Sequence, residues 1–169
     1  MRFKCWIWGV KLGNCSKFIG NMIIFRCPGS SIVIGDNCKF VSTSYGNFRG
    51  INHRCIFQTN TSNAKIRIGH NCGFSGVSLV CSESVIIGDD CLIGANVVIG
   101  DRDDHSDVYH TPYKPVEIKS GTWIGMNVCI LKGVTIGHNT IIGANSVVTK
   151  SIPDNVIAAG NPCRVIKQR

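Results

Sequence analysis

Branched aliphatic residues recur at every sixth position along the second half of this chain, and two earlier segments repeat the same step. The members are Ile118, Ile124, Ile130, Ile136, Ile142 and Val148, with Ile87, Ile93, Ile99 and Ile68, Phe74, Val80 before them. If about a quarter of positions carry such residues, six consecutive hits arise by chance roughly once in several thousand trials. A period of six fits neither a helix nor a hairpin sheet, and it indicates a parallel β-helix.

A second, smaller residue stands two positions before each aliphatic, as Thr122 does before Ile124. Two residues spaced by two lie on the same face of a strand, so each hexapeptide predicts one short strand with a large and a small inward side chain. Bends are marked by a glycine after the aliphatic, and often by Asn two residues later, as in Gly137 and Asn139. We expect both residue types to accept the positive φ of a tight corner.

The repeats predict a single all-β solenoid domain over residues 1–169. We expect an irregular N-terminal cap at 1–31, coils at 32–100 and 116–150, an extruded loop at 101–115, and a short C-terminal segment at 151–169. The residues expected to cover the open first coil are Trp6, Ile7, Trp8 and Phe18.

The net charge of +8 is unevenly distributed along the chain. Five cations precede the first acid, Asp36, and such a basic end attracts phosphate-rich ligands or anionic lipid headgroups. No nucleic-acid-binding motif accompanies the charge, which argues against nucleic acid as a partner. No apolar run approaches the roughly 18 residues of a membrane span, so we expect membrane contact to be peripheral at most.

Ten cysteines raise the question of disulfides. Cys38, Cys72 and Cys91 fall in the small inward slot of the repeat, where a thiol is a compact apolar filler. No Cys-x-x-Cys spacing and no secretory signal are present, so we expect reduced thiols in the cytoplasm.

The repeat stops between Ile99 and Val116, where four of the ten acids and two of the five histidines gather. His105 follows Asp103 and Asp104, and a carboxylate can fix an imidazole tautomer, so His105 is a candidate general base. His110 is its rival within the same loop. By contrast, His70 and His138 occupy corner positions taken by aspartate in other repeats, and we expect them to be structural.

Several segments together resemble the hexapeptide-repeat acetyltransferases, and especially the maltose, galactoside, capsule and lipopolysaccharide O-acetyltransferases. These are the isoleucine-glycine hexapeptides, the acidic loop with its histidine, Trp123-Ile124-Gly125-Met126-Asn127-Val128, Gly143 through Lys150, and Ala159-Gly160-Asn161-Pro162-Cys163-Arg164. The resemblance implies a left-handed parallel β-helix and a homotrimer with active sites between subunits. It also implies acetyl-CoA as cosubstrate, no metal, and a sugar or glycan acceptor in polysaccharide biosynthesis.

The resemblance also assigns residues. His105 matches the catalytic base, and Asp103 could orient it. The positions that match coenzyme A contacts are Trp123, Gly125, Met126, Ala144, Thr149, Lys150 and Arg164, of which Lys150 and Arg164 would hold phosphates. The acceptor is expected near Phe74, Gly76 and Asp104.

Four alternatives remain open at this point. A covalent cysteine mechanism is one, although buried thiols are inert. The γ-class carbonic anhydrases share the solenoid and bind zinc through histidines, for which His70, His105 and His110 are the candidates. A non-catalytic trimeric scaffold is the third. Within acyl transfer, the acceptor could instead be an amino sugar or an antibiotic.

Overall fold

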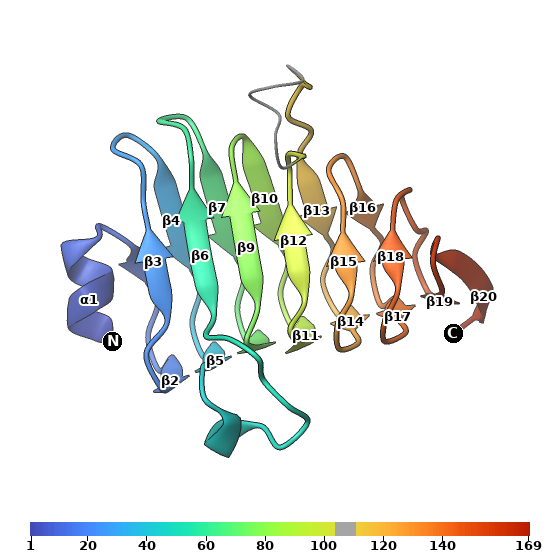
Figure 1. Ribbon diagram of the computed structural model, residues 1–169, viewed down its shortest axis with the longest axis horizontal. Helices are drawn as coiled ribbons and strands as arrows, with labels where there is room; N and C mark the ends of the chain where they lie inside the picture. The colour runs from blue at the N-terminus through green and yellow to red at the C-terminus, as the bar shows by residue number, and fades with distance from the viewer. Residues whose placement is uncertain (104–110) are drawn as a thin grey trace.

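The computed structural model describes residues 1–103 and 111–169. The chain passes from one parallel sheet to the next and returns to the first, so it builds stacked three-sided coils (Figure 1). This confirms the parallel β-helix that the six-residue period predicted.

The three sheets are named A, B and C in the order in which each coil visits them. Sheet A contains β1 (Lys11–Leu12), β4 (Ser31–Ile34), β7 (Lys65–Ile68), β10 (Ser84–Ile87), β13 (Val116–Ile118) and β16 (Thr135–Ile136). Sheet B contains β2 (Lys17–Ile19), β5 (Lys39–Val41), β8 (Gly73–Ser75), β11 (Leu92–Ala95), β14 (Trp123–Ile124), β17 (Ile141–Ile142), β19 (Val156–Ala159) and β20 (Arg164–Gln168). Sheet C contains β3 (Ile23–Phe25), β6 (Ile56–Thr59), β9 (Ser78–Cys81), β12 (Val98–Gly100), β15 (Cys129–Ile130) and β18 (Val147–Val148). The strands pair in parallel except for β20, which runs antiparallel to β19.

The inward positions of the repeat form one continuous core. Ile93, Ile124 and Ile142 lie in register on adjacent strands of sheet B and are almost completely buried. Toward the N-terminus the same column becomes aromatic, since the ring of Phe40 stacks on those of Phe18 and Phe74 at centroid distances of 5.1 and 5.2 Å. Burial of these aligned side chains is what holds one coil against the next.

Two different physical reasons account for the glycine and the asparagine at the corners. The asparagine two positions after the glycine adopts positive φ, as expected, for example at Asn71, Asn127 and Asn145. The preceding glycines, contrary to our expectation, do not adopt positive φ. Close packing explains them, because a Cβ on Gly125 would lie 2.6 Å from the amide nitrogen of Ala144 in the next coil.

The solenoid begins earlier than the sequence analysis placed it. Strands β1, β2 and β3 form a first coil within residues 11–25, paired in register with the second, so the segment before the coils ends at residue 10 rather than 31. Helix α1 (Arg2–Ile7) covers this coil through Cys5, which is buried. Trp6 and Ile7, expected to cover the coil, are 73% and 60% exposed, because they lie on the outer face of α1.

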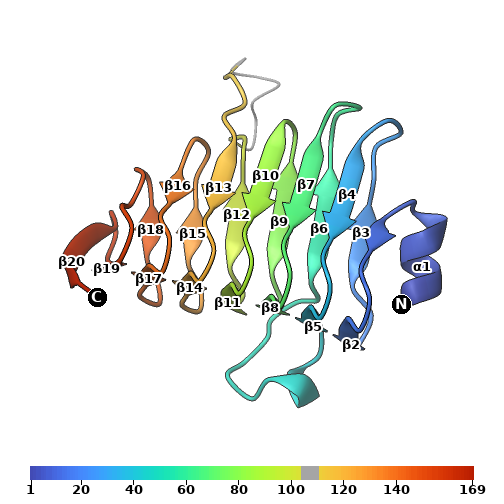
Figure 2. The ribbon, with the colours of Figure 1, turned by 180° about the vertical axis from the view of Figure 1, so that it is seen from behind.

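Two segments leave the coils at different corners. Residues 101–115 connect sheet C to sheet A, and residues 42–55 connect sheet B to sheet C. Loop 42–55 carries the short 3-10 helix η1 (Ser44–Gly46) and interrupts coils that we had expected to be continuous over 32–100. The views from both sides show the η1 segment and the stem of loop 101–115 projecting in opposite directions from the solenoid (Figure 2).

All ten cysteines are free, and those in the predicted inward slot are buried. Burial raises the pKa of the Cys55 thiol. Burial, followed by the charge of Asp101, raises the pKa of Cys81 to about 12. Such thiols stay protonated and are poor nucleophiles. Among the described helices, none is long and apolar enough to cross a membrane.

Candidate active site

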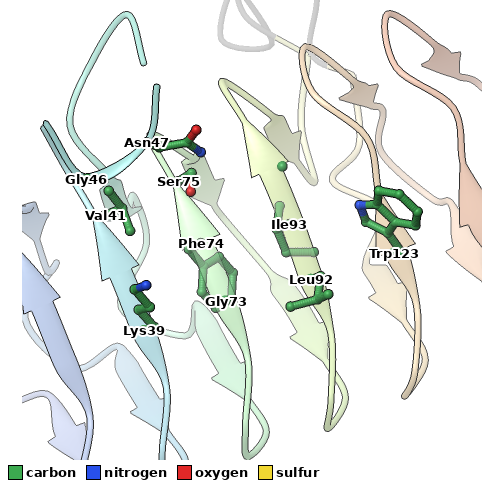
Figure 3. A pocket seen from close by; sticks show the side chains of 11 residues that line it. Lys39, Val41, Gly46, Asn47, Gly73, Phe74, Ser75, Leu92, Ile93 and Trp123 are labelled. Atoms are coloured by element: carbon green, nitrogen blue, oxygen red, sulfur yellow. The ribbon is translucent and has the colours of Figure 1, made fainter. Parts of the chain in front are cut away.

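A groove runs along the outer face of sheet B. It consists of two adjoining hollows of about 280 and 480 Å³, which share Asn47, Gly94 and Trp123. Figure 3 shows the first hollow, floored by β5, β8 and β11 with Asn47 at one side and Trp123 at another. Its lining residues are Lys39, Val41, Gly46, Asn47, Gly73, Phe74, Ser75, Leu92, Ile93, Gly94 and Trp123. Asn47, Arg49, Gly94, Ala95, Trp123, Gly125, Met126, Ile141, Ile142, Gly143 and Ala144 line the second.

Apolar side chains stand in a row beside the groove. Leu92, Trp123 and Ile141 lie in register on β11, β14 and β17 and point outward because their neighbours in sequence point into the core. Leu92 is 56% exposed and Trp123 is 53% exposed. The strand alternation therefore presents an apolar strip on the surface, parallel to the axis of the solenoid.

Glycines line the groove next to that strip. A Cβ on Gly94 would lie 2.8 Å from the amide nitrogen of Met126, and Gly125 is crowded in the same way by Ala144. Close packing of successive coils therefore requires glycine at these positions.

Loop 42–55 provides one wall of the groove through Asn47 and Arg49. The Asn96 side chain fixes the loop: its Oδ1 accepts the Asn52 N–H at 2.8 Å and its Nδ2 donates to the Gly50 carbonyl at 2.8 Å. Asn47 Oδ1 accepts the Arg49 N–H at 2.9 Å, which sets the turn that carries Arg49.

The stem of loop 101–115 is anchored by a buried carboxylate. Asp101 is fully buried, and its oxygens accept the backbone N–H groups of Ser82, Glu83 and Ser84 at 2.6 to 3.0 Å. Its own carbonyl accepts the Lys114 N–H at 2.9 Å, which ties the two ends of the loop together. Three converging N–H groups satisfy the charge of this carboxylate without a cation.

Lys132, from the next coil, holds the same stem from outside. Its Nζ lies 2.5 Å from Asp103 Oδ2 and 3.4 Å from the carbonyl oxygen of Pro112. The hydrogen bond from Lys132 holds the pKa of the Asp103 carboxyl below its ordinary value. Asp103 and Pro112, at the two ends of the loop, are therefore both bound by the Lys132 ammonium.

Comparison with known proteins identifies families and proteins that are similar to this chain. The family described as "Bacterial transferase hexapeptide (six repeats)" matches residues 115–150, and "Hexapeptide repeat of succinyl-transferase" matches residues 65–100. Galactoside O-acetyltransferase of Escherichia coli (strain K12) is 44% identical over 114 residues, which cover 62% of this chain and 55% of that protein. Over these segments the chain is similar to the hexapeptide-repeat acetyltransferases. Its solenoid is a left-handed parallel β-helix like theirs.

Two further relatives extend the comparison. A putative lipopolysaccharide biosynthesis O-acetyl transferase, WbbJ of Escherichia coli (strain K12), is 38% identical over 106 residues, 54% of either chain. A galactoside acetyltransferase solved in complex with coenzyme A superposes with a TM-score of 0.57 at 35% identity, covering 80% of this chain and 64% of that one. The chain thus spans little more than half the length of the curated relatives it matches.

The coenzyme positions inferred from the family resemblance lie in three places. Trp123, Gly125, Met126 and Ala144 all line the sheet B groove. Thr149 and Lys150 are exposed but follow β18, at the corner that leads from sheet C toward sheet A. Arg164 begins β20, paired with Ala159 at the C-terminal end of sheet B. One chain alone therefore assembles only part of the predicted coenzyme site.

The predicted catalytic base lies outside the described residues, as do Asp104 and His110. Asp103 is described, and its carboxylate contacts Lys132. Orientation of His105 by Asp103 stays a prediction, whereas the contact with Lys132 gives Asp103 a role in fixing the stem of the loop.

Of the predicted acceptor residues, Phe74 lines the N-terminal half of the groove, Gly76 lines neither hollow, and Asp104 lies outside the described residues. The Phe74 ring is 1% exposed and stacks in the core, so Phe74 presents only its main chain to the groove. Gly76 lies where loop 42–55 approaches the coil: a Cβ there would meet the Ile51 side chain at 2.6 Å and the His53 carbonyl oxygen at 2.7 Å.

Sequence reasoning missed Asn47, Arg49, Asp101 and Lys132. The available signal for loop 42–55 was the failure of the six-residue register after Phe40, since Gly46 and Asn52 occupy the next aliphatic positions. Among the described residues no three His, Cys, Asp or Glu side chains are grouped to hold a metal. His70, one of the three zinc candidates, accepts the Asp36 N–H through Nδ1 at 3.0 Å and thus stabilises a corner.

Proposed function

We propose that this protein transfers an acetyl group from acetyl-CoA to a hydroxyl of a sugar or glycan, in capsule, exopolysaccharide or lipopolysaccharide biosynthesis. The observation that carries the proposal is the groove of sheet B, where four of the seven residues matched to coenzyme contacts converge. The match to the hexapeptide-repeat models supports it, as do the names of two relatives, a galactoside O-acetyltransferase and a putative lipopolysaccharide biosynthesis O-acetyl transferase. The free thiols are in keeping with a reducing cytoplasm, where acetyl-CoA is made.

The pantetheine arm of the coenzyme would lie along the groove, parallel to the solenoid axis. The Trp123 ring and the Met126 side chain offer apolar contact, and the main chain beside Gly94 and Gly125 offers hydrogen bonds. The phosphates would lie toward Arg164, at the C-terminal end of the same sheet, where a guanidinium suits bidentate contact.

A homotrimer would complete the site. Thr149 and Lys150 lie at the corner between sheets C and A, on the same corner as loop 101–115, and not in the groove of their own chain. A neighbouring copy that places this corner against the groove would bring all seven coenzyme residues and His105 together. Each of the three identical interfaces would then hold one active site.

In the reaction, His105 would take the proton of the acceptor hydroxyl as its oxygen attacks the thioester carbonyl. The new C–O bond forms, the C–S bond breaks, and the sulfur of coenzyme A leaves as a thiolate that takes the proton from the imidazolium. A positioned base contributes roughly 10²- to 10⁴-fold to such a step. Backbone N–H groups beside the groove glycines would stabilise the negative charge that develops on the carbonyl oxygen.

The proposal is tested by acetyl-CoA turnover with a panel of sugars, nucleotide sugars and glycans, followed by thiol release. We expect His105→Ala to lower kcat by about 10²- to 10⁴-fold, whereas His138→Ala, which alters an exposed corner histidine, should change it little. Failure of the wild type to bind acetyl-CoA would contradict the proposed function.

Mixed trimers test the intersubunit arrangement with the same assay. His105→Ala and Trp123→Ala chains, inactive alone, should regain activity after refolding together, with about a quarter of the sites restored. No recovery would show that both residues of a site come from one chain.

A further inference from the structure

The half of the groove nearest the N-terminus has no role in the coenzyme site described above. This half, the hollow around Lys39, Asn47 and Ser75, adjoins the coenzyme half at Gly94 and Trp123. A ligand seated there would lie end to end with a coenzyme in the other half. It is therefore the place for the second substrate.

The charges around this compartment have one sign. Lys39 lines its floor. Arg49 lines the adjoining hollow, next to Asn47, which both hollows share. The described residues that line the two hollows include no aspartate or glutamate. Neither the Lys39 ammonium nor the Arg49 guanidinium makes a hydrogen bond or an ion pair with another described residue. Two cations in a concave surface without a counter-charge favour an anionic ligand.

The main chain that carries Arg49 is held in place before any ligand arrives. Asn47 accepts its N–H, and Asn96 holds Gly50 and Asn52 immediately after it. Lys39 extends from β5, a strand paired on both sides in sheet B. Pre-organised cations lose less entropy on binding than cations on unrestrained segments.

We propose that the acceptor is an anionic sugar, bearing a phosphate or a carboxylate, and that Lys39 and Arg49 recognise its charge. This inference rests on the proposed function, which assigns the other half of the groove to the coenzyme. The charged group contacts Lys39, and the reacting hydroxyl points toward Trp123, where the two compartments meet.

Lys17 is the natural control for this inference. It lies directly beside Lys39 in the register of β2 and β5 and faces outward on the same sheet, yet it lines neither hollow. A general effect of positive charge on this face would involve both lysines equally, whereas a binding contact would involve Lys39 alone.

The test is calorimetric binding of matched sugars in the presence of saturating coenzyme A. The probes are glucose, galactose and N-acetylglucosamine, each compared with its 1-phosphate and its uronic acid. For at least one sugar we expect an anionic form to bind about tenfold or more tightly than its neutral form. The preference should disappear in Lys39→Glu, weaken in Arg49→Gln and persist in Lys17→Glu.

Each outcome of this experiment either supports or contradicts an anionic acceptor. Preference for the 1-phosphate alone or for the uronic acid alone identifies the anion as a phosphate or a carboxylate. Equal binding of all neutral and anionic forms, equal loss in Lys17→Glu and Lys39→Glu, or displacement of the anionic probe by coenzyme A would overturn the anionic acceptor. Normal binding and turnover of acetyl-CoA alongside such a result would leave the proposed function standing.

Discussion

The two loops that leave the solenoid are held to it by different chemistry. Loop 42–55 is held through the neutral amide of Asn96, which belongs to an asparagine ladder that also stabilises the coil corners. The stem of loop 101–115 is held through charges, with Asp101 buried beneath it and Lys132 bound to Asp103 outside it.

This difference follows from what each loop is proposed to do. A loop that forms the wall of a binding groove needs a stable outline, which hydrogen bonds to a regular ladder provide. A loop that carries a catalytic base must place one atom accurately, and a misplacement of about 1 Å can cost 10²-fold in rate. Charge-assisted bonds are shorter and stronger than neutral ones and fix a stem more tightly.

The largest effect is expected from the buried anchor. In Asp101→Asn, an NH₂ group replaces one oxygen that accepts backbone N–H groups, and buried donors lose their partner at about 1–3 kcal/mol each. We therefore expect the free energy of unfolding in urea to fall by about 2–4 kcal/mol. Asp90→Asn is the control, because Asp90 is an exposed corner residue where asparagine is equally suitable. A loss below about 0.5 kcal/mol would mean that the stem does not depend on this carboxylate.

An intermediate effect is expected from removing the Lys132 ammonium, which binds both ends of loop 101–115. Lys132→Met should lower kcat about tenfold, with little change in KM for acetyl-CoA, because the legs of the loop are no longer fixed. Lys119→Met removes an ion pair of the same length, with Glu117 on β13, in which no described residue of the loop takes part, and should leave kcat unchanged. Equal kcat losses in the two variants would refute a specific role for Lys132.

The same variant predicts a pH dependence. Because Lys132 lowers the pKa of Asp103 in the folded state, the stability from this pair is fully present above the ordinary carboxyl pKa. It is lost as the pH falls through the lowered value. The difference in unfolding free energy between the wild type and Lys132→Met should thus be present at neutral pH and vanish in acid, and a difference that persists in acid would contradict the assignment.

The smallest effect is expected in loop 42–55. Asn96→Gly keeps the positive φ of this corner but removes the two bonds to Gly50 and Asn52. Loss of about 1 kcal/mol of local stability should speed tryptic cleavage at Arg49 about fivefold. Asn145→Gly removes a ladder amide that contacts neither Asn96 nor the loop and should leave this cleavage unchanged.

The sequence predicted the strands better than it predicted the ends of the coils. Periodicity identifies inward positions directly, so the predicted core residues from Ile87 to Val148 are buried. The prediction for Val80 was wrong: Leu79 takes the inward position opposite Ile99, because the six-residue register shifts by one residue after Phe74. The first coil was not predicted, because its six-residue register holds only through Leu12, Phe18 and Ile24. Such a run is too short to separate from chance. Burial by α1 through Cys5 could not be foreseen either, since the aromatic residues around it are stronger hydrophobic signals.

The candidate site was predicted less completely than the fold. The family resemblance pointed to Trp123 and Met126, and both line the groove of sheet B. Arg49 and Lys132 act through contacts with segments far away in sequence, and no spacing rule links them to their partners. Asp101 was counted among the acids of the loop, although its burial makes it an anchor rather than part of an exposed charged surface.

The antiparallel strand β20 has a consequence for self-association. A solenoid of parallel coils ends in an open strand edge onto which another coil, or another molecule, can add indefinitely. By reversing direction, β20 covers the edge of β19 with a strand whose five residues are all exposed. At the opposite end α1 covers the first coil. We therefore expect copies to meet through the long sides of the solenoid rather than end to end.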